Sequence, residues 1–137
     1  MQTTMEFAST RFTLDLEQLS NDEERAVMRA LRYGRSAARS VPALAEETGL
    51  PPRRVQSIVK HLILKHGVPI GTSMGRPAGN YLIDDPEDLE ATTELLRIRA
   101  IQSLARVAAL QKMSHRRLLK EIQPELDAVV QEAQEAA

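Results

Sequence analysis

The chain has 137 residues, no cysteine and a formal net charge of −1, which fits one ordinary domain with an appended element rather than a multidomain enzyme. The lack of cysteine excludes a disulfide scaffold and thiolate metal ligands. No apolar run reaches the ~18 residues that a membrane-spanning helix needs. The N-terminus also lacks the basic-then-apolar order of a secretion signal. We therefore expect a soluble cytoplasmic protein.

The nearly neutral total conceals an uneven distribution of charge. Residues 1–24 carry −5, residues 25–83 carry +8 and residues 84–137 carry −4. Residues 50–83 contain no acidic side chain. A basic segment of this kind is typical of a surface that contacts nucleic-acid phosphates, although a simple solvated face would have the same composition.

The N-terminal part of the chain gives two expectations. Residues 1–19 scatter Phe and Leu among Thr, Ser, Asp and Glu, so we expect a flexible arm with at most a short strand near residues 11–16. Residues 20–23, Ser-Asn-Asp-Glu, have the spacing of a capping box. They predict a helix that starts at about Asn21 and ends near Gly34.

The next segment predicts two helices joined by a tight turn. A short helix over residues 42–48 precedes Gly49, which can adopt the left-handed backbone conformation that such a turn needs. Ala45 is small at the point where the helices would cross, and Pro52 suits the first turn of a second helix, residues 52–66. The apolar residues expected to wedge the helices together are Leu44, Leu50, Val55 and Ile58.

Two short β-prone runs follow the second helix. Residues 67–71 and 80–83 are separated by a loop that contains Gly75, Arg76 and Pro77. This order predicts a β-hairpin with a flexible tip. We also expect a short strand at residues 40–41 to pair with this hairpin.

This order of elements resembles the winged helix-turn-helix of bacterial and phage DNA-binding proteins, similar to the biotin-repressor type. The resemblance rests on the spacing of Ala45, Gly49, Leu50 and the apolar residues after them, and on the hairpin. It implies a mainly α fold with a small β-wing, in which residues 20–85 form the winged helix-turn-helix domain. In that family the second helix enters the major groove of DNA and the wing lies beside it.

The outward face of the second helix supplies the candidates for base recognition. A B-form major groove admits one helix, and residues near the helix N-terminus read the base edges. The candidate base-reading residues are Arg53, Gln56, Ser57 and Lys60. The candidates for contacts from the wing or to the DNA backbone are Arg35, Arg39, Arg54, His61, Lys65, Thr72, Ser73 and Arg76.

The C-terminal part predicts two long helices. Asp85 is placed to cap a helix that opens at Pro86 and runs to about residue 112, so the carboxylates beside it suit a helix start better than acid/base chemistry. Ser114 is placed to cap a last helix, in which Pro124 would produce a kink or a break.

Two apolar stripes on the long helix predict two packing partners. One partner can be the N-terminal domain, and the other a second subunit or the last helix. We expect residues 86–137 to form a helical dimerisation element, the alternative being an intramolecular helical hairpin. The candidate dimer residues are Leu96, Ile98, Ile101, Leu104, Leu118, Ile122 and Leu126.

The sequence offers no convincing catalytic or metal-binding pattern. His61 and His66 would point about 140° apart on a helix, His115 is remote, and no cluster of acids joins them. No Ser/His/Asp spacing suggests a nucleophile. We therefore expect no enzymatic activity, no metal, no cofactor and no small-molecule ligand.

The sequence as a whole predicts a homodimer that binds double-stranded DNA in a sequence-specific manner, most simply as a transcriptional regulator. Two alternatives remain open. One is a winged-helix protein-interaction module, which would not need a surface without acids. The other is a DNA-binding accessory factor in replication, partition or phage packaging.

Overall fold

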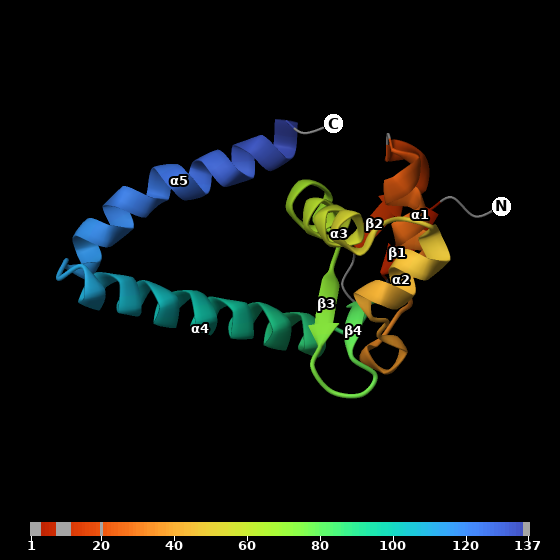
Figure 1. Cartoon of the computed structure of the whole chain (residues 1–137), viewed down its shortest axis with the longest axis horizontal. Helices are drawn as coiled ribbons and strands as arrows, with labels where there is room; N and C mark the ends of the chain where they lie inside the picture. The colour runs from red at the N-terminus through yellow and green to blue at the C-terminus, as the bar shows by residue number, and fades with distance from the viewer. Residues whose placement is uncertain (1–3, 8–11, 20, 136–137) are drawn as a thin grey trace. The chain divides into compact units, whose positions relative to one another are not determined.

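The structure is a computed structural model that describes residues 4–7, 12–19 and 21–135. The described part is mainly helical, with two small two-stranded antiparallel sheets (Figure 1). This confirms the mainly helical class predicted from the sequence. The chain divides into two compact units, residues 1–89 and residues 90–136.

The N-terminal segment belongs to the folded first unit. Strand β1 (Thr4–Phe7) pairs antiparallel with β2 (Phe12–Asp15), and the 3-10 helix η1 (Leu16–Gln18) follows. Its buried apolar side chains, each at most 5% exposed, are Leu14, Leu16 and Leu19. The short strand expected near residues 11–16 is present as β2. The described residues 12–19 are not a flexible arm, because their leucines enter the core, and residues 1–3 and 8–11 of the expected arm lie outside the described residues.

Helix α1 (Asp22–Ala30) is capped by Asn21, whose side chain accepts the Glu23 N–H at 2.7 Å. The predicted start is confirmed, but the expected cap Ser20 lies outside the described residues. The helix ends before the predicted Gly34, because the chain after residue 30 becomes extended and bridges to the hairpin.

Helices α2 (Val41–Thr48) and α3 (Pro52–His66) are joined by the predicted tight turn. Gly49 has a φ of +75°, and its N–H donates to the Ala45 carbonyl at 2.9 Å. Helices α1, α2 and α3 pack against one another in pairs. The core residues of α2 and α3, each at most 2% exposed, are Leu44, Val55, Ile58 and Leu62.

Strands β3 (Ile70–Ser73) and β4 (Gly79–Leu82) form the antiparallel hairpin after α3. Two backbone bridges attach it to the segment between α1 and α2. Arg39 and Asn80 exchange hydrogen bonds of 2.8 and 2.9 Å, and a second bridge joins Tyr33 to Leu82. The expected third strand at residues 40–41 is one residue too late, because those residues cap and begin α2. The hairpin is thus fixed to the segment that precedes α2.

Helix α4 (Pro86–Leu110) begins in the first unit, and its Asp85 cap accepts the Glu87 N–H at 3.0 Å as predicted. The boundary between units follows Leu89, later than the expected residue 85. The reason is that Leu89 packs on the buried residues Tyr81 and Ile83. The first turn of α4 is therefore part of the first unit.

The second unit contains the remainder of α4 and helix α5 (His115–Glu135). Ser114 caps α5 as predicted, since its hydroxyl accepts the Arg117 N–H at 3.2 Å. Pro124 does not break α5, which runs through it as one helix. Proline removes only one helical hydrogen bond, so the turns on either side can continue.

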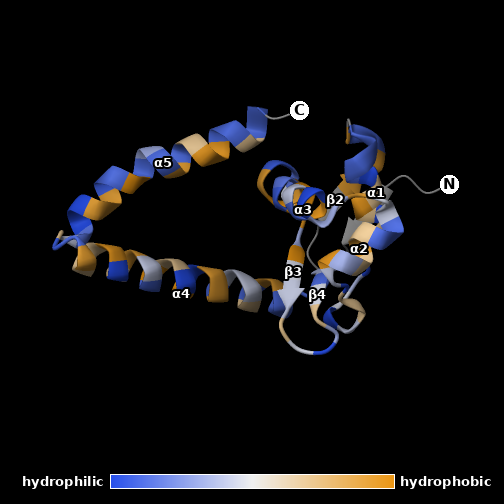
Figure 2. Cartoon of the chain, in the orientation of Figure 1, coloured by the Kyte–Doolittle hydropathy of each residue, from blue (hydrophilic) through white to orange (hydrophobic). Residues whose placement is uncertain are grey.

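The two long helices bury little of their apolar surface within the second unit. Figure 2 shows hydrophobic residues recurring along both of them. The large apolar side chains that remain 42–61% exposed are Leu95, Leu96, Ile98, Ile101, Leu119, Leu126, Val129 and Val130. No helix among the described residues has both the length and the apolar character required to cross a membrane.

Candidate nucleic-acid interface

The outward face of α3 brings the four predicted base-reading residues together. Their spacing of three and four residues places Arg53, Gln56, Ser57 and Lys60 on adjoining positions of one helix surface. All four are exposed, because α3 buries the opposite face. In the described part of the chain, neither Arg53 nor Lys60 forms an ion pair. Their charges are therefore not neutralised within the fold.

A groove between α3 and the β3–β4 hairpin adjoins this face. Gln56 and Lys60 line it from α3, and Thr72 and Asn80 line it from the hairpin. The Thr72 hydroxyl donates to the Asn80 side-chain oxygen at 3.2 Å. The floor of the groove is apolar and consists of Val41, Val59, Ile63 and Leu64. Two base-reading candidates and one hairpin candidate thus share one surface.

The hairpin tip presents a cation, Arg76, that forms no ion pair with any other residue that the structure describes. Arg76 is exposed, and its neighbour Met74 is 80% exposed. Ser73 is only 3% exposed, so its predicted contact with DNA is wrong. In an alternating strand the side chain of Ser73 points to the opposite face from the exposed Thr72. We call the exposed residues Arg53, Gln56, Ser57, Lys60, Thr72 and Arg76 the α3–hairpin surface.

Two arginines predicted to contact the DNA backbone are engaged within the first unit. Arg39 donates to the Glu47 carboxylate at 2.8 Å and to the Ala30 carbonyl at 3.0 Å, and its side chain is 24% exposed. Arg54 lies 3.3 Å from the Glu23 carboxylate. The sequence could not show these pairs, because the acids belong to other helices. Arg39 is a structural residue, and Arg54 reaches a phosphate only by leaving its partner.

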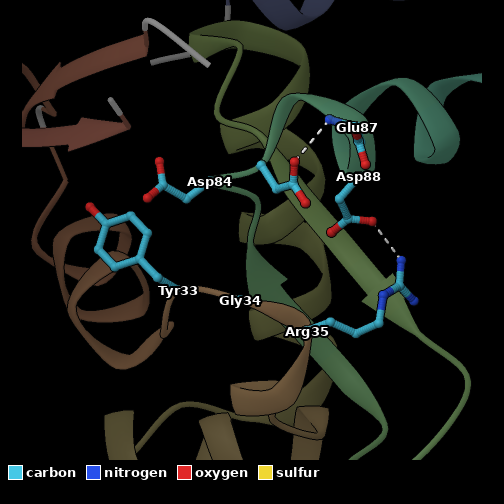
Figure 3. A pocket seen from close by; sticks show the side chains of 7 residues that line it. Tyr33, Gly34, Arg35, Asp84, Glu87 and Asp88 are labelled. Carbon is cyan, nitrogen blue, oxygen red and sulfur yellow. Dashed lines mark hydrogen bonds and ion pairs between the residues drawn. The ribbon is translucent and has the colours of Figure 1, made fainter. Parts of the chain in front are cut away.

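Arg35 is the third of the predicted backbone-contact arginines that binds a carboxylate within the first unit (Figure 3). Its guanidinium donates to Asp88 at 2.7 Å and lies 5.2 Å from the centre of the Tyr81 ring. The Tyr81 hydroxyl donates to the same carboxylate at 2.6 Å. The hydrogen bond with Asp88 is the main cause that raises the pKa of Arg35 above its ordinary value.

The surroundings of Arg35 are unsuited to a phosphate. The pocket in Figure 3 contains four carboxylates, those of Asp84, Asp85, Glu87 and Asp88. Like charges within a few ångströms of a bound phosphate repel it. The contact of Arg35 with the DNA backbone stays a prediction, and it would require the arginine to leave Asp88. In the structure the arginine ties the start of α4 to the rest of the first unit.

His61 and His66 meet beside Glu24 of α1. Nε2 of His61 lies 3.2 Å from one Glu24 oxygen, Nε2 of His66 lies 3.8 Å from the other, and the ring centres are 5.8 Å apart. The expectation that no acid joins these histidines is wrong, because α1 carries Glu24 between the two rings. His61 therefore faces α1, and its predicted contact with DNA would require the side chain to leave Glu24.

The last turn of α3 is less exposed than the sequence suggested. Burial is the largest cause that lowers the pKa of His66 below its ordinary value, with smaller lowering contributions from the charges of His61 and Lys65. Glu24 acts in the opposite direction. Lys65 is itself only partly exposed, so it is a weaker candidate for a phosphate contact than Lys60.

The candidate dimer residues fall into two groups. Leu118 is buried at 4% exposure, where it lines a small apolar pocket with Leu104, Ala105 and His115. Its predicted role between subunits is wrong, because it packs within the second unit near the turn between α4 and α5. Leu104 and Ile122 are partly buried. The candidates that remain well exposed are Leu96, Ile98, Ile101 and Leu126.

Comparison with known proteins identifies no relative. The chain matches no protein-family model, no curated protein and no solved structure. Its function is therefore inferred from its own residues and their arrangement.

Proposed function

We propose that the first unit is a winged helix-turn-helix that binds double-stranded DNA, with α3 as the recognition helix and the β3–β4 hairpin as the wing. One observation carries the proposal. The exposed face of α3 presents Arg53, Gln56, Ser57 and Lys60. These residues belong to a segment, residues 50–83, that contains no acidic side chain. Helix dimensions match the major groove, and these residue types bind base edges and phosphates.

The α3–hairpin surface divides into readers and positioning contacts. Arg53 can donate two parallel hydrogen bonds to guanine, and Gln56 can pair in the same way with adenine, each worth about 1–3 kcal/mol of discrimination. Lys60 and Arg76 can neutralise phosphates. On a random duplex, where Arg53 contacts phosphate as well, the three cations per subunit should make the logarithm of the binding constant fall with the logarithm of salt concentration, with a slope of about −3 for one subunit and about −5 for two.

A double substitution of Arg53 and Lys60 by alanine tests the proposal. Fluorescence anisotropy with a labelled random duplex, measured across a salt series, should show binding weakened by about tenfold or more at low salt. The salt slope should become shallower by about 2 per subunit. The reason is that the variant loses two of the three cations that no acid neutralises within the fold.

A matched control distinguishes the effect of removing charge from the α3–hairpin surface from the effect of lowering the net positive charge anywhere on the protein. Substitution of Arg99 and Arg106 on α4 by alanine removes the same charge from two exposed positions outside the first unit. This control should bind nearly as tightly as the unchanged protein. If both variants lose affinity equally, or if the unchanged protein binds no duplex at low salt, the proposal is wrong.

The proposal also includes a homodimer formed through α4 and α5. Exposed apolar side chains along these helices, such as Leu96, Ile101 and Leu126 at 55–61% exposure, are unfavourable in water and form a surface of the kind that subunits bury. A dimer would present two recognition helices to two half-sites. Regulation of transcription is the simplest use of such an arrangement, and an accessory role in replication, partition or packaging would use the same surface.

Substituting Ile101 by glutamate should weaken the dimer. Burying an unpaired carboxylate in an apolar interface costs several kcal/mol. In sedimentation velocity, the dimer of the variant should therefore dissociate to monomers at concentrations at least tenfold higher than the dimer of the unchanged protein does. Gln102→Glu places the same charge at the adjacent exposed position and should leave association nearly unchanged. An unchanged protein that sediments as a monomer at high concentration would exclude the dimer.

A second candidate function, a protein-interaction module, is favoured by one feature. The groove between α3 and the hairpin has an apolar floor that includes Ile63, which is 39% exposed. Such a groove could accept an apolar side chain of a protein partner. Binding that is insensitive to salt and to the Arg53 and Lys60 substitutions would favour this function over DNA binding.

A further inference from the structure

Glu24, His61 and His66 form a cluster with the chemistry of a metal site. Each residue offers one ligand atom, and these atoms lie within 4.8 Å of one another. We propose that this cluster binds a divalent transition-metal ion, Zn²⁺ or Co²⁺, through one carboxylate oxygen and two imidazole nitrogens. A fourth position would remain open to water.

The distances within the cluster are close to those that a bound ion requires. Zinc binds His nitrogen at about 2.0–2.1 Å and carboxylate oxygen at about 2.0–2.2 Å, which separates neighbouring ligand atoms of a tetrahedral site by about 3.3 Å. Nε2 of His61 lies 3.2 Å from Oε1 of Glu24, and Nε2 of His66 lies 3.8 Å from the other oxygen, Oε2. One oxygen and the two ring nitrogens lie within 4.8 Å of one another, so the ligand atoms must move closer around an ion. Small rotations of the two rings would complete the site.

The electrostatics of the cluster also favour a bound cation. The Glu24 side chain is 5% exposed, and within the described residues no lysine or arginine pairs with it. Nε2 of His61 is buried and makes no hydrogen bond in that part of the chain. A buried carboxylate and a buried ring nitrogen without a hydrogen bond are both costly. A metal ion would satisfy both atoms.

The position of the cluster determines what the metal would do. Glu24 belongs to α1, and the two histidines belong to the C-terminal half of α3. A bound ion would therefore link α1 to α3 and stabilise the first unit, since a ligand that binds only the folded state raises the melting temperature. This role does not depend on DNA binding, because none of the three residues belongs to the α3–hairpin surface.

Metal titration of the full chain, expressed without a histidine tag and stripped with a chelator, tests the site. Calorimetry with Zn²⁺ should give one ion per chain, and Co²⁺ should produce the visible absorption of a site with nitrogen and oxygen ligands. Saturating Zn²⁺ should raise the melting temperature. Glu24→Gln and His66→Gln should each weaken binding at least tenfold and abolish the thermal shift, because both remove a ligand while keeping the side chain similar in size.

His115→Gln is the matched control, since this histidine belongs to the second unit and is not one of the three cluster residues. It should bind Zn²⁺ as the unchanged protein does. Circular dichroism of the metal-free variants verifies that they remain folded, and His61→Gln provides a further ligand variant if one of the others unfolds. Absence of stoichiometric binding, or binding that persists in all three ligand variants, would overturn the proposal.

Discussion

Substituting Leu62 by alanine should lower the free energy of unfolding of the first unit by about 2–5 kcal/mol. Leu62 is 0% exposed and lies in the core formed by α1, α2 and α3. Truncation removes buried methyl and methylene groups and leaves a cavity that the surrounding helices can fill only in part. Because domains of this size have only about 5–15 kcal/mol of stability in total, the loss should be obvious in a urea unfolding curve.

The adjacent residue provides the control for this prediction. Ile63 has a similar side chain but is 39% exposed at the edge of the groove, so Ile63→Ala should cost about 1 kcal/mol or less. A cost for Ile63→Ala as large as that for Leu62→Ala would show that α3 is rotated about its axis relative to the structure. The face that carries Arg53 and Lys60 would then be assigned wrongly.

Replacing Gly79 by alanine should break the bridge that joins the hairpin to Arg39. The φ of Gly79 is +126°, and an added Cβ would lie 2.0 Å from the Arg39 carbonyl oxygen. An unfavourable backbone conformation costs on the order of 1–3 kcal/mol, and the clash can be relieved only by breaking the bridge between Arg39 and Asn80. Hydrogen exchange should show faster exchange of those two amides, together with a loss of about 2–4 kcal/mol in unfolding free energy.

Gly75→Ala is the matched control for the hairpin. Gly75 lies in the same loop, and the nearest atom to an added Cβ is the Ser73 hydroxyl oxygen at 3.9 Å, an ordinary contact. Its effect on stability should stay within about 0.5 kcal/mol. If Gly79→Ala also leaves the exchange of the Arg39 and Asn80 amides unchanged, the bridge between them does not hold the hairpin.

Elements specified by neighbouring residues could be predicted from the sequence. The turn at Gly49 depends on a left-handed residue between two amphipathic segments, and both signals lie within a few positions of each other. The bounds of α3 were predicted correctly for the same reason, since Pro52 opens it and Gly67 closes it. Caps at Asp85 and Ser114 likewise act over two or three residues.

Features that depend on distant contacts could not be predicted in this way. Arg35 and Asp88 are 53 positions apart, so nothing in the local pattern shows that this arginine is engaged. The angle between His61 and His66 on an isolated helix suggested separation, but Glu24 from another helix lies between the rings. The segment that contains Leu14, Leu16 and Leu19 was predicted to be a flexible arm, because three leucines are too few to reveal the periodic apolar pattern of a packed element.

The structure leaves fewer residues available to contact DNA than the sequence suggested. Arg35 and Arg39 serve the fold, whereas Arg53, Lys60 and Arg76 remain free within the described residues. A smaller number of free cations predicts a moderate salt dependence and gives more weight to base contacts from Arg53 and Gln56. The hypothesis therefore depends on one helix face.

The most direct test of that claim is an amide chemical-shift titration of the isotope-labelled protein with a short DNA duplex at low salt. The largest shifts should fall on residues 52–60 of α3 and residues 72–78 of the hairpin, and they should diminish as salt is added. Such a result would locate DNA on the α3–hairpin surface. Shifts confined to α4 and α5, or no shifts at a saturating excess of duplex, would contradict the assignment of α3 as a recognition helix.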